Sequence, residues 1–105
     1  MSTRATIAVR RGDQTYDAVY LHFDGYPQYT GEQLMKHHQS PEAADALIAG
    51  GDVRCLETDG TVGRFADGKP AETQSNHNEL LRFARRCGAN YIYVFDGRTW
   101  NCTKL

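Results

Sequence analysis

The sequence predicts an α+β domain: a mainly antiparallel sheet, built from N- and C-terminal hairpins, with about three helices packed on one face. Two observations lead to this class. Apolar residues alternate near both ends of the chain, as in half-buried strands, whereas the middle carries apolar residues at helical spacing between capping residues. A length of 105 residues suits one unit, so we expect residues 1–105 to form a single domain.

The N-terminal hairpin is predicted from two alternating runs joined by the turn residues RGDQ. Residues 4–10 read RATIAVR and residues 16–23 read YDAVYLHF. In the second run Val19, Leu21 and Phe23 should face the core. Tyr20, His22 and Asp24 should then project together from the opposite face, because side chains alternate along a strand.

Two helices should follow this hairpin. Thr30 with Gln33 forms a capping-box pattern, which predicts a helix over residues 31–39. Ser40-Pro41 should end that helix and begin another, since proline suits the first helical position. Gly50-Gly51 should close the second helix.

The next segment is predicted to begin with a short hairpin near Val53 and to continue as a polar loop through Ser75. Asn76 and Glu79 then form the capping signature of a third helix, residues 77–87. The arginines on its outer face are typical of a solvated helix surface.

The Asp-Gly pair at 96–97 predicts a C-terminal hairpin with a two-residue turn. This turn would pair Tyr93 with Trp100 and leave Tyr91, Tyr93, Phe95 and Trp100 on one face. Whether that aromatic face belongs to the core or to an interface stays open, and an uncovered face would favour a homodimer or a partner.

Composition narrows the function classes. Twelve basic and thirteen acidic residues leave almost no net charge, which argues against general nucleic-acid binding. The N-terminal residues contain no long apolar run, so we expect neither a signal peptide nor a membrane association, and a cytoplasmic location follows. The three cysteines lack CxxC spacing, which favours free thiols over a zinc site. We expect no cofactor and no bound metal.

The best candidate site is the corner at residues 20–31, YLHFDGYPQYTG. Its predicted binding residues are Tyr20, His22, Asp24, Tyr26 and Tyr29, since tyrosines on an irregular loop suit recognition of a protein or a planar ligand. If the protein is an enzyme, His22 and Asp24 are the candidate catalytic pair, as a carboxylate can orient an imidazole.

A structural interpretation of the same corner is favoured over catalysis. Asp24 would cap the turn, and His22 would bond to a neighbouring strand or a tyrosine. Two ligands are too few for a metal site, and no spacing requires His37, His38 or His77 to complete one.

The chain also resembles a family of uncharacterised small proteins carried by phages and other mobile elements. The matching motifs are residues 2–9, the corner HFDGY at 22–26, the helical residues 34–38, DALIAGGDV at 45–53, and the aromatic hairpin from Tyr91 to Trp100. Phe23 stands where that family usually has tryptophan. The resemblance implies a genomic setting and a shared fold, and it implies no reaction.

These observations favour a small non-enzymatic binding protein of a mobile element. It would engage a host protein, an element-encoded protein or a small ligand through residues 20–31, and interference with host defence is one subclass. The alternatives are a small metal-assisted hydrolase that uses His22 and Asp24, and a homodimer built on the terminal hairpin.

Overall fold

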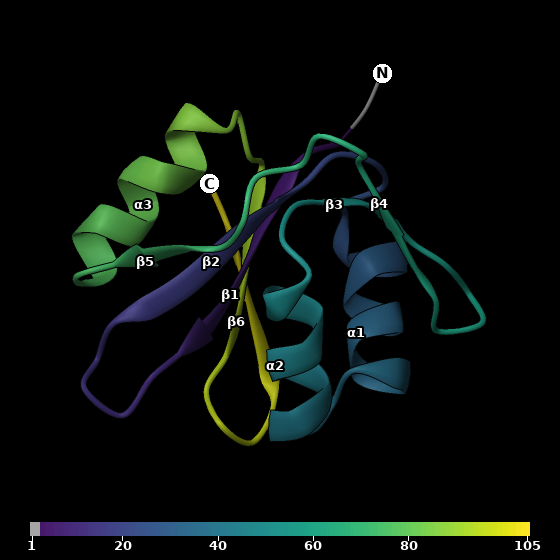
Figure 1. Ribbon diagram of the computed structural model, residues 1–105, viewed down its shortest axis with the longest axis horizontal. Helices are drawn as coiled ribbons and strands as arrows, with labels where there is room; N and C mark the ends of the chain where they lie inside the picture. The colour runs from purple at the N-terminus through teal and green to yellow at the C-terminus, as the bar shows by residue number, and fades with distance from the viewer. Residues whose placement is uncertain (1–2) are drawn as a thin grey trace.

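The computed structural model describes residues 3–105 and confirms an α+β domain, with three α-helices and a mixed, mostly antiparallel sheet of seven strands in that range (Figure 1). The elements are β1 (Ala5–Arg10), β2 (Tyr16–Leu21), the π-helical turn η1 (Pro27–Gly31), α1 (Glu32–His37), α2 (Pro41–Ala49), β3 (Val53–Leu56), β4 (Val62–Arg64), β5 (Glu72–Gln74), α3 (His77–Arg86), β6 (Tyr91–Phe95) and β7 (Trp100–Lys104). None of the helices in residues 3–105 has the length and apolar content to span a bilayer.

The strands follow the order β4-β3-β2-β1-β6-β7, so the two terminal hairpins share one sheet and β7 lies at its edge. β1 is antiparallel to β2 and parallel to β6, and Ile7 lies between Val19 and Tyr93. β5 and β3 share the outer edge of β2, with β5 pairing at residues 16–18 and β3 at Leu21.

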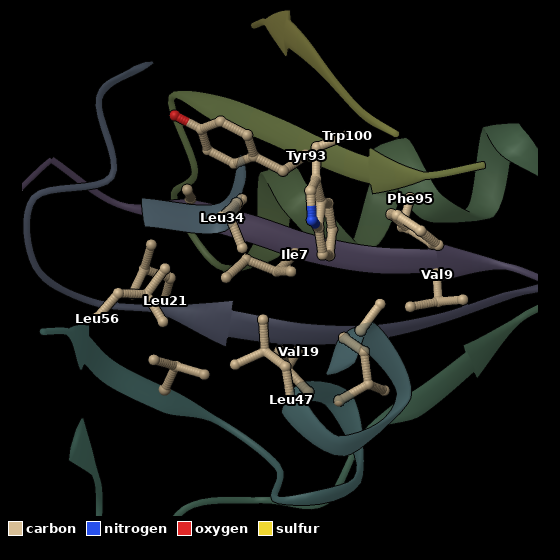
Figure 2. Packing of buried hydrophobic residues seen from close by; sticks show 14 residues of the cluster. Ile7, Val9, Val19, Leu21, Leu34, Leu47, Leu56, Tyr93, Phe95 and Trp100 are labelled. Atoms are coloured by element: carbon tan, nitrogen blue, oxygen red, sulfur yellow. The ribbon is translucent and has the colours of Figure 1, made fainter. Parts of the chain in front are cut away.

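Helices cover both faces of the sheet, so the prediction of three helices on one face is wrong for α3. The main core lies under α1 and α2, where Figure 2 shows Leu34 and Leu47 beside the side chains of the central strands. A second core lies under α3, on the opposite side of the sheet in Figure 1. Its members are Ala8, Ala18, Leu80, Phe83, Ala84 and Ile92. The second face is apolar because β1 and β2 carry alanines where a solvated face would carry charges.

Two of the three predicted helix starts are confirmed. The Ser40 hydroxyl accepts a hydrogen bond from the Ala43 amide at 3.1 Å, and the Asn76 side-chain oxygen accepts one from the Glu79 amide at 2.9 Å. The capping box at Thr30 is wrong, because the Thr30 hydroxyl donates to the Asp24 carbonyl at 2.6 Å. The chain enters α1 through η1 instead.

The C-terminal hairpin has a four-residue loop, so the predicted register is shifted by two residues. Phe95 pairs with Trp100, and Tyr93 pairs with Cys102. The Asp96 carboxylate accepts hydrogen bonds from the amides of Arg98 and Thr99, which stabilises the longer loop. The aromatic face is core: Tyr93, Phe95 and Trp100 are buried and cluster in Figure 2.

The segment after α2 contains one strand more than predicted. The β3–β4 hairpin is confirmed, with Leu56 opposite Val62. Residues 72–74, which lie in the predicted polar loop, form β5 and pair with β2.

Candidate functional site

Backbone contacts fix the corner that follows β2. The amides of His22 and Phe23 donate to carbonyls of β3, and the Gly25 amide donates to the Thr3 carbonyl at 2.8 Å. A Cβ on Gly25 would lie 2.8 Å from that Thr3 oxygen, so only glycine fits here. The buried Tyr93 hydroxyl donates to the Gly25 carbonyl at 2.6 Å. The corner is therefore held by β3, by β6 and by Thr3, which precedes β1.

His22 pairs with Tyr20. The Tyr20 hydroxyl and Nδ1 of His22 form a hydrogen bond, and the His22 ring lies edge-on to Phe23 at 4.4 Å and to Phe65 at 5.7 Å. This arrangement matches the structural interpretation, in which His22 bonds to a tyrosine.

Asp24 lies outside the strand on which it was predicted to share a face with His22. β2 ends at Leu21, and Asp24 has a φ of 57°, in the left-handed region. The alternation that would place the two side chains on one face therefore stops before Asp24. Phe23, expected in the core, is half-buried beside the guanidinium of Arg54, whose carbon lies 5.6 Å from the ring centre.

Tyr26 and Tyr29 form a second pair, with ring centres 6.4 Å apart. The Tyr29 hydroxyl donates to the Leu56 carbonyl at 2.6 Å and ties η1 to β3. Burial raises the pKa of Tyr29. Tyr26 keeps 37% of its surface exposed. Of the two rings, Tyr29 thus has an architectural contact and Tyr26 is presented to solvent.

A mostly apolar groove of about 630 Å³ borders the far end of the corner. We call it the corner groove, and its apolar lining comprises Pro27, Gly31, Met35, Tyr93, Trp100 and Cys102. Met35 keeps 55% of its surface exposed, which is unusual for a large apolar side chain. Of the five predicted binding residues, none lines this groove, although Tyr26 directly precedes Pro27.

An unpaired strand edge lies along the same groove. The Thr99 carbonyl accepts a hydrogen bond from the Asp96 amide, and the Leu105 amide donates one to the Asn90 carbonyl. Because backbone groups alternate in direction along an antiparallel strand, those of every second residue between Thr99 and Leu105 also point toward β6. The backbone groups of Trp100, Cys102 and Lys104 therefore point away from the sheet, and we call this row the β7 edge. No strand of residues 3–105 pairs with it.

Tyr20 lines a different cavity, of about 480 Å³, on the α3 face. The predicted site residues thus form the pair Tyr20–His22, the pair Tyr26–Tyr29 and the exposed carboxylate of Asp24. Sequence reasoning missed Met35 and Cys102, and it did not single out Gly31 within the corner. An apolar Met35 next to Leu34 on a short amphipathic helix was the available signal.

The remaining histidines do not gather around His22. Nε2 of His37 contacts the Thr58 carbonyl at 2.9 Å, and the His77 ring lies edge-on to Tyr16 at 6.2 Å. His38 is buried at the end of α1, and burial lowers its pKa. Within residues 3–105 no three His, Cys, Asp or Glu side chains come together as a metal site. The geometry therefore lends no support to a metal-assisted hydrolase at His22 and Asp24.

No family model, curated protein or solved structure matches this chain.

Proposed function

We propose that the protein is a binding module that receives an extended segment of a partner protein along the β7 edge and in the corner groove. The observation that carries the proposal is the placement of a mostly apolar groove directly beside an unpaired strand edge. A partner strand that adds to a sheet edge gains main-chain hydrogen bonds, while pockets for alternate side chains provide specificity.

The geometry supplies both components of such recognition. Trp100, Cys102 and Lys104 offer outward amides and carbonyls to a partner strand. One side chain of that strand would enter the groove and cover Met35. Burying the exposed half of this methionine contributes about 1 kcal/mol, on the scale for apolar side chains.

The corner supports this surface from one end. η1 carries Pro27 and Gly31 into the groove, and the exposed ring of Tyr26 lies just before them in the chain. Tyrosine at the rim of an apolar patch is common in protein interfaces. The corner thus retains a role in binding, through Tyr26 and η1.

The partner would be a host protein or an element-encoded protein. The resemblance of HFDGY at 22–26 and of the hairpin from Tyr91 to Trp100 to mobile-element proteins supports this part of the proposal. Interference with a host defence protein is the subclass that we favour.

Site-specific photo-crosslinking tests the proposal. A photoreactive amino acid at Met35 should capture the partner from a host lysate, whereas the same residue at the exposed Arg82, on the α3 face, should not. The captured protein is then identified, purified and measured directly against the wild-type chain.

A groove-filling variant gives the sharpest control. A Cβ on Gly31 would lie 3.7 Å from the Tyr93 ring, so Gly31→Leu occupies the groove without backbone strain. It should weaken binding about tenfold or more, the scale of a hot-spot change. Gly12→Leu, where a Cβ meets nothing within 4 Å, should bind as the wild type does.

Two results would overturn the proposal. Equal crosslinking from Met35 and Arg82 would place the contact elsewhere. Crosslinking of Met35 only to a second copy of the chain would replace the partner by a homodimer, and light scattering over a concentration series would show that dimer.

A further inference from the structure

The cavity on the α3 face has a charge pattern that the proposed function does not use. This α3 cavity lies on the opposite face of the sheet from the corner groove and has a volume of about 480 Å³, within the usual range for small-molecule sites. Its floor is formed by Tyr20, Phe83 and Cys87, and its rim by Asp52, Lys69, Glu72 and Arg86.

The cavity exists because no single strand pairs with β2 along the whole of its outer edge. β5 pairs with the first half of β2 and β3 pairs with its end, which leaves the backbone of Tyr20 between them. The Asp52 carboxylate fills this gap: it accepts hydrogen bonds from the amides of Tyr20 at 3.0 Å and Lys69 at 3.2 Å. The break in the sheet thus becomes one wall of the cavity.

The floor is apolar and uncharged. Phe83 is buried in the second core, and Cys87 is half-buried beside it. Burial raises the pKa of the Cys87 thiol, so the thiol stays neutral at physiological pH. Cys87 lines the same cavity as the four rim charges.

The charged residues that line the cavity are two acidic and two basic, and none of the four forms an ion pair in the part of the chain that the structure describes. The salt bridges of residues 3–105 do not involve Asp52, Lys69, Glu72 or Arg86. The Arg86 guanidinium lies 5.7 Å from the centre of the Phe83 ring, at the junction of rim and floor. β5 places Glu72 opposite Ala18, so the glutamate projects on the α3 face.

A balanced rim favours one class of ligand. A ligand with net negative charge would gain from Lys69 and Arg86 but would meet repulsion from Asp52 and Glu72. A zwitterion carries one group of each charge, so it can bind the acidic and the basic residues of the rim at the same time. An ammonium group can bond the carboxylates, and a carboxylate can accept hydrogen bonds from the lysine and the arginine. The apolar floor then suits an apolar side chain.

We infer that the α3 cavity binds the zwitterion of a free α-amino acid with an apolar side chain. Its ammonium group lies toward Glu72 and Asp52, its carboxylate toward Arg86 and Lys69, and its side chain against Phe83 and Tyr20. This is a second binding site, separate from the β7 edge.

L-Phenylalanine is the probe, and calorimetry with amide NMR of the full chain is the assay. The expected result is saturable binding with shifts at Tyr20 and Cys87. Phenethylamine lacks the carboxylate and 3-phenylpropionate lacks the ammonium group, so each should bind about tenfold more weakly or worse, as expected for loss of a charge-assisted hydrogen bond.

Three variants complete the test. Glu72→Gln and Arg86→Gln should each weaken the binding of L-phenylalanine by a similar factor. Arg85→Gln, which changes an exposed residue on the same helix, should leave the affinity unchanged. Gly31→Leu should also bind L-phenylalanine normally, which separates this site from the corner groove. Absence of binding at millimolar L-phenylalanine, binding of either analogue as tight as that of L-phenylalanine, or unchanged affinity in either cavity variant would overturn the inference.

Discussion

Replacing Tyr93 by phenylalanine tests how the corner is held to the sheet. The ring is 1% exposed and its hydroxyl donates to the Gly25 carbonyl at 2.6 Å. Tyr93→Phe keeps the ring but leaves this carbonyl without its partner. Losing a buried hydrogen bond in this way costs about 1–2 kcal/mol. For a domain of this size the Tm should fall by roughly 5–9 °C.

Thermal denaturation followed by circular dichroism measures this change, with Tyr91→Phe on the same strand as the control. Tyr91 is only half-buried, so its variant should stay close to the wild type. If the Tm of Tyr93→Phe lies within about 1 °C of the wild-type Tm, the reasoning is refuted, because the hydroxyl would then contribute nothing to the stability of the corner.

Tyr93→Phe should also change how the stability of the protein depends on pH. Burial, and then the neighbouring Cys102, raise the pKa of Tyr93 above its ordinary value of 10.0. Above pH 10 the unfolded chain loses this proton while the native chain keeps it, so the unfolded state binds fewer protons. Stability therefore falls as pH rises past 10, and Tyr93→Phe should flatten part of that fall.

The remaining predictions concern local structure. Gly25→Ala should destabilise the fold by about 1–3 kcal/mol in urea unfolding, because its Cβ would lie 2.9 Å from the Cβ of Ala5; a neutral result would show that the corner is loose. Asn76→Ala removes the cap of α3 and should cost about 1 kcal/mol in the same assay, whereas no loss would mean that the cap bond is absent in solution. The amides of Thr99 and Arg98, followed by the side chain of Asn101, lower the pKa of Asp96 from 3.8 to about 2. The native carboxylate therefore stays ionised below pH 4, and the stability that it adds is lost as pH falls toward 2. Asp96→Ala should remove that part of the acid dependence of Tm, and an unchanged profile would contradict the loop geometry.

Local signals in the sequence located most elements. The caps at Ser40 and Asn76 need only one side chain and a nearby amide, so they form wherever the helix forms. The alternation in β2 likewise placed Val19 and Leu21 in the core. These features are decided within a few residues of the chain, and they were predicted correctly.

Features that depend on competing hydrogen bonds or on packing between elements were missed. Thr30 bonds to the Asp24 carbonyl, and this alternative to capping exists only because the corner folds back. The hairpin register follows the Asp96 side chain, which competes with the expected two-residue turn. The helix on the second face of the sheet was not predicted, because alanines such as Ala8 and Ala18 are compatible with either a solvent-exposed face or a face covered by a helix.

The sequence pointed to only part of the surface that we propose as the binding site. The corner does border a groove, but the groove is completed by Met35, four residues after the corner in α1, and by Cys102 from β7, which lies far away in the chain. His22 and Asp24 were expected to work together, and the early end of β2 removes the basis for that pairing. Long-range packing, which one sequence does not reveal, assembles this surface.

Residue-resolved amide hydrogen exchange, in the presence and absence of the captured partner, tests the central proposal most directly. In the free chain the amides of Asn101 and Thr103 should be protected by β6, while those of Cys102 and Lys104 should exchange rapidly. Partner binding should slow exchange at Cys102 and Lys104. If these two amides keep their free rates while protection arises elsewhere, the β7 edge does not receive the partner.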